Sequence, residues 1–413
     1  MDTVHILPKL QSGFRKGHST CTALVNLFSD LIDAKDKGMF STLVMLDYSQ
    51  AFDSISHELL LAKMHFYGFG EEALEWIESY MKDRVQVTKL GSEVSASLIK
   101  RRGVPQGSCL GPVLFNLYTS DFPDCVKNST AHQYADDCQL HLSFEPSKIE
   151  DAFFKINNDL QAISKWSMEN GLKLNAKKCS VLHLAPKDFI QTATDRRVAI
   201  VLDGESLRAC DNVKTLGVVL DRDLSFSEHV SHSVQRAVGR LRGLYRHRSL
   251  LPQAVKLTLM QTMVLSVFSY CYPAYGNSIS KEDTYRIQLV HNSAVRFIFS
   301  LQKYEHVSSF RDDLNMLPME AVCRMMTVCL VHKVLTQGQP VYLSERLQYR
   351  DEVSPRSTRQ DRQLHFPKVK LECGRKSFSY FGPKYFNDLP MGLKSIVSCA
   401  GFKNKVKHFL KLE

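Results

Sequence analysis

The sequence lacks the features that mark secreted, zinc-binding or membrane-spanning proteins. None of its eleven cysteines forms a CxxC pair, and the closest two are Cys323 and Cys329, which argues against a disulfide framework or a structural zinc site. The N-terminus, MDTVHILPKL, has neither a basic region nor an apolar run, so we expect no signal peptide. The most apolar stretch, 257–272, contains polar residues and stops before Pro273, and we expect a buried helix there, not a membrane span. A reducing, intracellular compartment follows.

Composition narrows the class of protein further. With 44% hydrophobic and 23% charged residues, the 413-residue chain can bury a core, which excludes low-complexity disorder, collagen and a pure coiled coil. At about 150 residues per domain, this length predicts two or three domains. Lys and Arg number 53 against 43 Asp and Glu, a net charge of +10 that favours a polyanionic partner, nucleic acid before an anionic membrane surface.

Hydrophobic periodicity predicts a mixed order of helices and strands in the first half of the chain. Residues 19–38 have a helical period, and residues 42–46 form a short apolar run that reads as a buried strand ending at Asp47. Residues 56–83 should be helical with a break at Gly68 and Gly70, 84–100 a hairpin, 103–112 a loop and 113–118 a helix.

The remaining elements become increasingly helical. We expect two short strands over 132–143 with a turn at Asp136 and Asp137, an amphipathic helix over 147–170, and short strands from 172 to about 220. Helices dominate from 227 onward, residues 349–363 resemble a linker, and residues 402–410 form a basic helix. One expected helix has an apolar stripe made by Val234, Val238, Leu241 and Tyr245.

Three segments carry candidate chemistry: LDYSQAFD at 46–53, GVPQGSCLGP at 103–112 and YADD at 134–137. Adjacent carboxylates repel each other and raise each other's pKa, a cost that a divalent cation removes. Three carboxylates at neighbouring strand ends would suit a two-metal phosphoryl-transfer site. Taken singly, each segment also has a plain interpretation, because an Asp-Asp turn can be a solvated loop, Asp47 a helix N-cap and GVPQG an ordinary turn.

Together and in this order, these segments resemble the palm motifs of reverse transcriptases, and most closely those of non-LTR (LINE-type, jockey-like) retrotransposons. The segment QSGFRKGHST at 11–20 is similar to the family's fingers segment. Trp166 with GLKLNAKK at 171–178 resembles the next motif, and TLGV at 215–218 resembles the hairpin that grips the primer. Six ordered motifs are far more specific than any one of them.

The resemblance implies a catalytic centre with two Mg²⁺ ions, with Mn²⁺ as an alternative ion. Asp47, Asp136 and Asp137 would be catalytic metal ligands together with the Tyr48 carbonyl, and Lys178 would donate a proton to the leaving pyrophosphate, with Lys177 as a rival. Both lysines could equally be solvated surface charges.

The resemblance also implies contacts to dNTPs, the RNA template and the DNA primer or target. Phe52 would act as a gate against a ribose 2′-hydroxyl, unless it is simply a core residue, and Asp53 would make a local hydrogen bond or cap. The implied dNTP- and template-binding residues are Arg15, Ser49, Gln50, Ala51, Phe52, Pro105, Gln106 and Gly107. The implied primer- or hybrid-binding residues are Leu216, Gly217, Arg236, Arg240, Arg242 and Arg246, although the arginines could form an exposed face without a partner.

The expected architecture is α+β, a right-hand polymerase palm with partial fingers, followed by a helical thumb and an α-helical C-terminal region. We expect partial fingers and palm at 1–225, thumb at 226–300 and a basic C-terminal region at 301–413. The chain reads as N-terminally truncated, because the strand upstream of the fingers segment is absent and no endonuclease, RNase H or CCHC motif is found.

The expected activity is RNA-directed DNA polymerisation from dNTPs, with no membrane partner and a location in nucleus and cytoplasm. The alternative is a catalytically crippled remnant that still binds nucleic acid. A group II intron-type maturase shares YADD but fits the other two motifs less well, and a viral RNA polymerase would carry a GDD turn, which is absent from the sequence.

Overall fold

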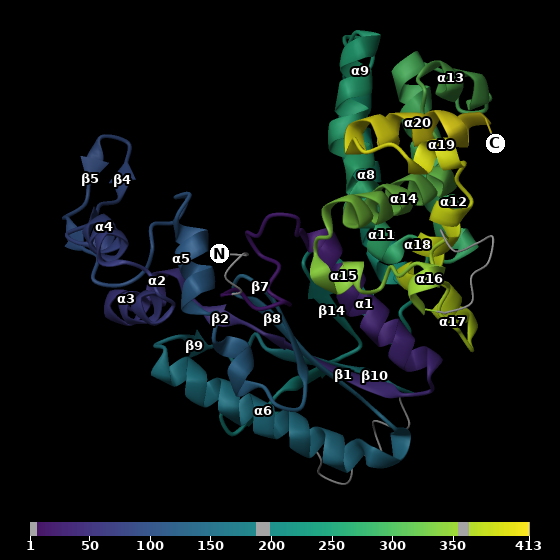
Figure 1. Cartoon of the computed structure of the whole chain (residues 1–413). Coiled ribbons are helices and arrows are strands. Elements are labelled where there is room, and N and C mark those ends of the chain that lie inside the picture. Colours follow the sequence, from purple (N-terminus) through teal and green to yellow (C-terminus); the bar gives the residue numbers. More distant parts are fainter. Residues whose placement is uncertain (1–5, 187–198, 354–362, 413) are drawn as a thin grey trace. The chain divides into compact units, whose positions relative to one another are not determined.

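The structure is a computed structural model that describes residues 6–186, 199–353 and 363–412 (Figure 1). It divides into two compact units, which we call the first unit (residues 1–19 and 39–213) and the second unit (residues 20–38 and 214–413). The mixture of helices and sheet confirms the expected α+β class. The expected boundaries at 225/226 and 300/301 stay predictions.

The first unit is built on a five-stranded sheet in the order β13-β10-β1-β8-β7. Neighbouring strands are antiparallel except β10 and β13, which are parallel. Strand β1 lies in the centre and is buried over most of its length, as its run of apolar and β-branched residues predicts. The five strands are β1 (Phe40–Leu46), β7 (Thr130–Tyr134), β8 (Asp137–Phe144), β10 (Ser180–Leu184) and β13 (Arg208–Cys210).

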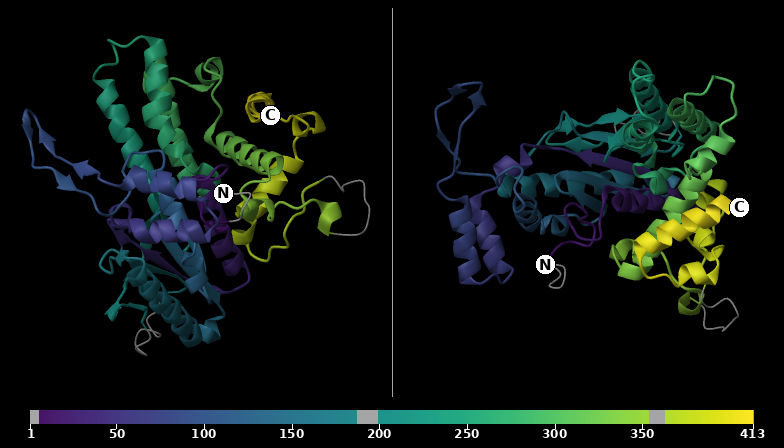
Figure 2. Two further views of the ribbon diagram at one scale, coloured as in Figure 1. Left: turned by 60° about the vertical axis from the view of Figure 1, so that its left-hand side comes forward. Right: turned by 90° about the horizontal axis from the view of Figure 1, so that it is seen from above.

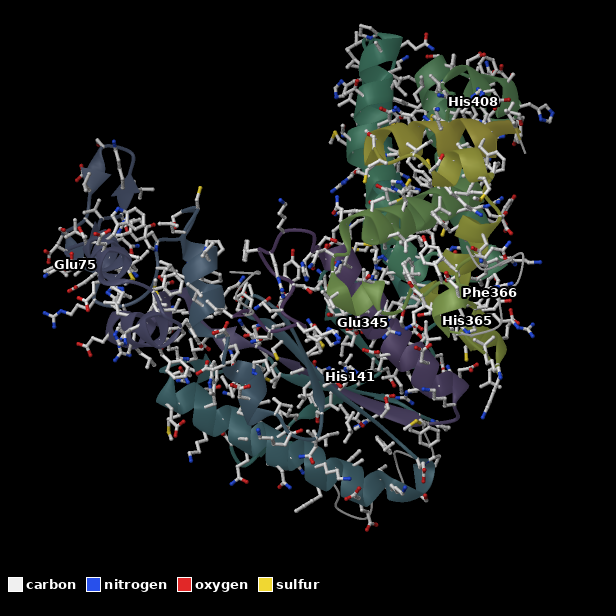
Figure 3. The ribbon with its side chains drawn as sticks, in the orientation of Figure 1. Glu75, His141, Glu345, His365, Phe366 and His408 are labelled. Carbon is white, nitrogen blue, oxygen red and sulfur yellow. The ribbon has the colours of Figure 1, made fainter. Side chains whose placement is uncertain are left out.

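Helix α6 (Ile149–Glu169) packs along one face of this sheet (Figure 1). Its predicted apolar stripe is confirmed, because every member is buried: Ile149, Phe153, Ile156, Leu160, Ile163 and Trp166. Within the sheet, His141 of β8, labelled in Figure 3, is buried and stacks on His132 of β7 with ring centroids 5.7 Å apart.

Two antiparallel helices and a projecting hairpin stand beside the sheet. Helix α4 carries exposed Glu75 on its outer side (Figure 3), and the predicted 84–100 hairpin extends away from α3 and α4 (Figure 2). The antiparallel pair is α3 (His57–Phe66) and α4 (Glu71–Met81), and the two other helices of this region are α2 (Ala51–Ser54) and α5 (Gly111–Tyr118). The hairpin strands are β3 (Val85–Gln86), β4 (Lys89–Leu90), β5 (Glu93–Val94) and β6 (Leu98–Ile99).

Short elements complete the first unit and lead into the second. They are β2 (Tyr48–Ser49), β9 (Lys173–Leu174), β11 (Val201–Leu202), β12 (Glu205–Ser206), β14 (Asn212–Thr215), β15 (Val218–Asp221), and the 3₁₀ turns η2 (Phe122–Cys125) and η3 (Pro146–Lys148).

The second unit is helical, as predicted from residue 227 onward, and includes α1 (Thr20–Asp36), which is buried almost all round. Its other long helices are α8 (Ser227–Tyr245), α12 (Lys281–Phe299), α14 (Met319–Gln337), α18 (Phe378–Asn387) and α20 (Cys399–Leu412). The shorter ones are α9 (Gln253–Leu259), π-helical η4 (Met260–Leu265), α10 (Ser266–Ser269), α11 (Tyr272–Tyr275), α13 (Ser308–Asp313), α15 (Val341–Ser344), α16 (Arg350–Val353), α17 (Glu372–Arg375) and α19 (Met391–Lys394). The predicted linker at 349–363 contains α16, and its residues 354–362 lie outside the described part.

Two burial predictions in this unit are corrected. Helix α8 buries a stripe made by Val230, Ser233, Ala237 and Leu241, whereas Tyr245 of the predicted stripe is 38% exposed. The small side chains of Ser233 and Ala237 let α8 approach α12 and η4 closely, so packing selects this neighbouring face.

The apolar stretch at 257–272 is less buried than its composition predicts. In the described part of the chain, Gln253–Tyr275 is the one helical stretch long and apolar enough to cross a membrane, and 28% of its window is buried. Between residues 253 and 270 one side is buried, with Lys256, Met260, Val264 and Phe268, and residues 271–275 are buried throughout. The π-helix η4 contacts α8 and α12, and α9 contacts α12.

Candidate active site

The structure brings the three predicted metal-binding acids of the first unit to one end of the sheet. Leu46 pairs with Cys138, so Asp47 leaves the end of β1 beside Asp137 at the start of β8. Asp137 also pairs with Tyr134, which leaves Ala135 and Asp136 as the turn between β7 and β8. The strand register therefore fixes the places of Asp47 and Asp137, whereas Asp136 is placed by the turn.

The carboxylates are close enough to affect one another electrostatically. Burial raises the pKa of Asp137, and the negative charges of Asp136 and Asp47 raise it further. Within the described residues, Asp47 Oδ1 is buried and accepts no hydrogen bond. A cation at this position would relieve the repulsion between the carboxylates, so these residues fit a divalent ion. As they stand, no three His, Cys, Asp or Glu side chains in the described part of the chain are arranged to hold a metal ion.

Lys178 is held over Asp47 by a tight turn. The Asn175 amide donates to the Asp47 carbonyl (2.9 Å) and the Lys178 amide donates to the Asn175 carbonyl (2.9 Å), which returns the chain to the end of β1. The Lys178 ammonium lies 3.6 Å from Asp47 Oδ1, and its side chain is 64% exposed. Lys178 therefore reaches the acids while staying accessible to solvent.

The turn that carries Asp136 is braced from behind by a contact that sequence reasoning missed. Ala135 has a positive φ of 57°, and its amide donates to Oε1 of buried Gln11 (3.2 Å), which also accepts from the Gly13 amide. Gly13 is required here because a Cβ would lie 2.5 Å from the Ala135 nitrogen. Asn116 Nδ2 donates to the Gly13 carbonyl (2.8 Å). The only sequence signal was the QSG of the fingers-like segment.

The residues after Asp47 form a compact turn. Tyr48 and Ser49 pair with Leu174 and Lys173, and the Tyr48 hydroxyl hydrogen-bonds with Ser167 (3.2 Å) while burial raises the pKa of this phenol. Gln50 is left-handed (φ 52°) and precedes α2, which begins at buried Ala51. The turn therefore anchors the Tyr48 ring against the core.

Phe52 lies at the edge of the core. Its ring stacks on Phe115 of α5 with centroids 4.4 Å apart and 17° between the planes, and it stays half-buried. This placement is compatible with either a gate or a core role.

The GVPQG loop is fastened to the α2 segment. The Gly103 and Val104 amides donate to the carbonyls of Ile55 (2.8 Å) and Phe52 (3.0 Å). Gly103 has a φ of +85°, and a Cβ there would lie 2.7 Å from the Asp53 Cα, so only glycine fits. Pro105, Gln106 and Gly107 follow, with Gln106 and Gly107 exposed.

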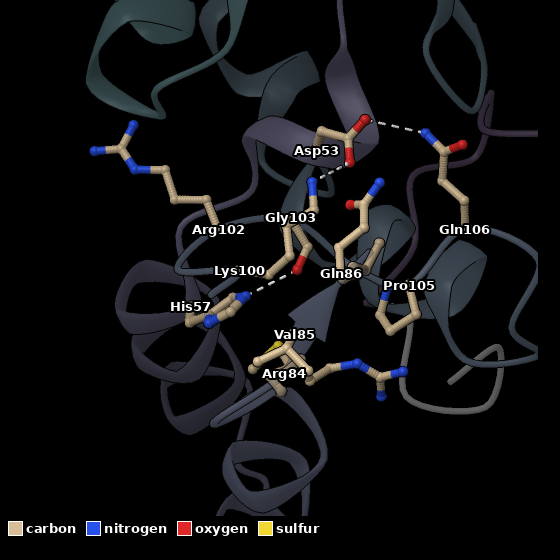
Figure 4. A pocket seen from close by; sticks show the side chains of 12 residues that line it. Asp53, His57, Arg84, Val85, Gln86, Lys100, Arg102, Gly103, Pro105 and Gln106 are labelled. Atoms are coloured by element: carbon tan, nitrogen blue, oxygen red, sulfur yellow. Dashed lines mark hydrogen bonds and ion pairs between the residues drawn. The ribbon is translucent and has the colours of Figure 1, made fainter. Parts of the chain in front are cut away.

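Asp53 joins this loop to the hairpin, so it makes hydrogen bonds as predicted, but to residues 47 and 53 positions further along the chain and not locally. Its carboxylate accepts from Gln106 Nε2 (3.1 Å) and lies 3.2 Å from Lys100 Nζ (Figure 4). These three residues line a pocket of about 350 Å³ with His57 and Arg84.

Other predicted ligand-binding residues lie elsewhere. In the first unit, the Arg15 guanidinium donates to the carbonyls of Pro8 (2.8 Å) and Gln11 (3.4 Å), and its predicted triphosphate contact stays a prediction. In the second unit, Leu216 and Gly217 form the turn between β14 and β15, where the Tyr270 hydroxyl donates to the Leu216 carbonyl (2.8 Å).

The four predicted arginines of the second unit are exposed, at or just after α8: Arg236, Arg240, Arg242 and Arg246. Arg240 donates to the Met263 carbonyl at 2.6 Å, so part of its donor capacity is used within the unit.

Comparison with known proteins agrees with the motifs. A family model described as reverse transcriptase (RNA-dependent DNA polymerase) matches residues 1–220, more than half of the chain. The probable RNA-directed DNA polymerase from transposon BS of Drosophila melanogaster is 28% identical over 332 residues, covering 76% of this chain and 35% of that protein. The polymerase from mobile element jockey of the same species is 26% identical, covering 76% and 34%.

The chain thus spans about a third of the length of these relatives. Among solved structures, telomerase from Candida albicans has a TM-score of 0.36 at 14% identity, covering 74% of this chain and 52% of that one. On the family match and its jockey-like relatives, the chain belongs to the reverse transcriptase (RNA-dependent DNA polymerase) family.

Proposed function

We propose that the chain is the polymerase portion of a non-LTR retrotransposon reverse transcriptase and extends a DNA primer on an RNA template with dNTPs. The observation that carries the proposal is the meeting of Asp47 with Asp136 and Asp137 at one sheet end, in a chain of this family. The net charge of +10 supports nucleic acid as the partner.

In this proposal, Asp47, Asp136, Asp137 and the Tyr48 carbonyl hold Mg²⁺ or Mn²⁺. When bound, the two ions would neutralise charge on the attacking and leaving oxygens. The chain's own contribution is positioning, because the strand register places the acids and the Asn175 turn holds Lys178 where it can give a proton to departing pyrophosphate.

The other elements take the roles that the family resemblance gives them. The sheet and its helices form the palm, and Phe52 and the GVPQG loop contact the nucleotide and template. The exposed arginines of α8 hold the hybrid backbone in a thumb at 226–300. Residues 301–413 are assigned no contact with substrate, and the nuclear and cytoplasmic location stays a prediction.

Primer extension tests the proposal. Purified protein should extend a DNA primer on an RNA template when dNTPs and Mg²⁺ are supplied, and Asp136→Ala should abolish extension. Asp151→Ala is the matched control, because Asp151 is an exposed acid of α6 paired only with Lys155 in the described structure. Equal background from wild type and Asp136→Ala would contradict catalysis. Salt-sensitive binding to the hybrid without extension would favour the nucleic-acid-binding remnant instead.

A further inference from the structure

Asp53 makes two contacts that divide its carboxylate between separate loops. Oδ1 faces the Lys100 ammonium at 3.2 Å, at the end of the 84–100 hairpin, and Oδ2 accepts from Gln106 Nε2 at 3.1 Å. An ammonium can only donate hydrogen bonds, so Lys100 occupies one acceptor site of Oδ1. Gln106 donates to the other oxygen, Oδ2.

The chemistry of this contact fixes the direction of the Gln106 amide. A carboxylate only accepts hydrogen bonds, whereas an amide has one donor end and one acceptor end. The NH₂ end of Gln106 must therefore face Asp53, and the carbonyl oxygen must point away from it, as Figure 4 shows. Because the Gln106 side chain is exposed, this oxygen is available to a ligand.

The backbone around the pair is held rigidly enough to preserve this direction. The loop is bonded to Phe52 and Ile55 through the amides of Val104 and Gly103, and His57 Nε2 lies 2.8 Å from the Gly103 carbonyl. A fixed backbone and a fixed partner leave the Gln106 amide one favourable orientation.

We propose that Asp53 is a positioning residue that makes Gln106 present a hydrogen-bond acceptor to a sugar hydroxyl of the bound nucleic acid or nucleotide. The inference rests on the proposed function and deepens it. A polymerase copies every sequence, so an acceptor in its template loop needs a donor that every nucleotide carries, and base amino groups do not meet this condition. Sugar hydroxyls do, either the 3′-hydroxyl of the incoming nucleotide or a 2′-hydroxyl of the RNA template.

Asp53→Asn tests the inference by reversing the polarity of the contact. Lys100 would hold the Asn oxygen, the Asn NH₂ would face Gln106, and the Gln106 amide would turn its own NH₂ toward the ligand. Nucleotide affinity is measured on a dideoxy-terminated primer annealed to RNA, so that no chemistry is needed. Ligands carrying the hydroxyl are compared with fluoro analogues, which cannot donate a hydrogen bond.

Wild type should bind the hydroxyl ligand more tightly than its fluoro analogue by about tenfold, the worth of one hydrogen bond, and Asp53→Asn should remove this preference. One arm uses 3′-fluoro nucleotides and the other a 2′-fluoro RNA template, and the arm in which the preference disappears identifies the hydroxyl. Lys100→Met, which leaves the Asp53–Gln106 contact in place, should retain the preference.

Equal weakening of both ligands by Asp53→Asn in both arms would mean that Asp53 is merely structural and would overturn the inference, as would a wild type without preference. Failure of the proposed function is seen separately, as a wild type that does not extend an unterminated primer. A wild type that forms no nucleotide complex would contradict both.

Discussion

Helix α1 in the second unit carries three aspartates whose charges are all met by donors from the same unit. Arg346 bonds Asp30 through Nη2 and Asp33 through Nη1, the latter at 3.0 Å. Buried Asp36 accepts from the backbone amides of Lys370 (2.9 Å) and Leu371 (2.7 Å). These acids, which we call the α1 acids, connect the helix to chain segments more than 300 residues away.

The acids at the β1–β8 end of the first unit, Asp47, Asp136 and Asp137, are treated differently. In the described structure, the buried Oδ1 of Asp47 accepts no hydrogen bond, and Lys178 approaches it only to 3.6 Å. Their mutual repulsion contributes to the raised pKa of Asp137. The α1 acids thus have donors within their own unit, although burial raises the pKa of Asp33 despite Arg346. The buried Oδ1 of Asp47, by contrast, keeps capacity for an external cation.

The largest expected effect is on primer extension, which should depend on the acids at the β1–β8 end and not on the α1 acids. Asp47→Asn should slow primer extension by about 10³-fold, since it removes a charge that would stabilise the metal-dependent transition state. The protein's unfolding free energy should be unchanged or higher, because the substitution relieves repulsion. Asp33→Asn, the matched change among the α1 acids, should leave the extension rate per folded molecule unchanged. A reversed pattern would show that the two groups have been assigned the wrong roles.

The next effect concerns stability. Arg346→Met should lower the free energy of unfolding by about 3 kcal/mol, because it leaves Asp30 and Asp33 partly buried without their shared donor. Denaturant unfolding monitored by circular dichroism measures the change. Arg375→Met is the control, since Arg375 is 60% exposed and its ion pair with Glu372 spans 3.6 Å, so a change within about 0.5 kcal/mol is expected. Equal losses for both variants would refute a special role for Arg346.

What could be predicted from the sequence follows from local patterns. The apolar period of α6, the strand that ends at Asp47 and the turn in YADD depend on residues close together in the chain, and the structure has all three. The strand ends then meet because antiparallel pairing leaves little choice of register. The elements of the candidate site were therefore predictable, while the roles of its residues stay predictions.

Other features depend on partners that no local pattern reveals. The bond from Ala135 to Gln11 joins residues 124 positions apart, and the burial of α1 depends on α11, α15, α17 and α18. The buried face of α8 was predicted only in part, because Leu241 is buried as expected but Ser233 and Ala237, which have weak apolar signals, are buried as well. Such contacts are selected by shape and hydrogen-bonding geometry between distant segments, which hydrophobic periodicity does not encode.

A smaller effect on the extension rate is expected from Lys178, the lysine of the first unit whose ammonium lies beside Asp47. Lys178→Met should slow extension by about 10²-fold, the typical contribution of a general acid, while Lys177→Met should leave the rate little changed. Pyrophosphate release in single-turnover extension, measured against pH, separates the two roles of Lys178. Loss of a proton donor should remove the alkaline limb of the profile, whereas loss of simple charge pairing with Asp47 should lower the rate equally at every pH.

The smallest expected effect is a gain in stability. Asp137→Asn should raise the free energy of unfolding at neutral pH, without divalent ions, by about 0.5–1 kcal/mol, the size of an interaction between neighbouring half-exposed charges. Because the folded pKa of Asp137 lies above the unfolded one, the folded protein binds more protons between the two values, and wild-type stability falls as pH rises through that interval. The variant lacks this dependence, so its advantage should vanish below about pH 4, where aspartates are protonated in both states.

Thermal unfolding from pH 3 to 8 measures the difference, with Asp151→Asn as the exposed control. Mg²⁺ should narrow the neutral-pH difference by stabilising wild type more than the variant, and a gain that persists at pH 3 would mean that packing, not charge, is responsible.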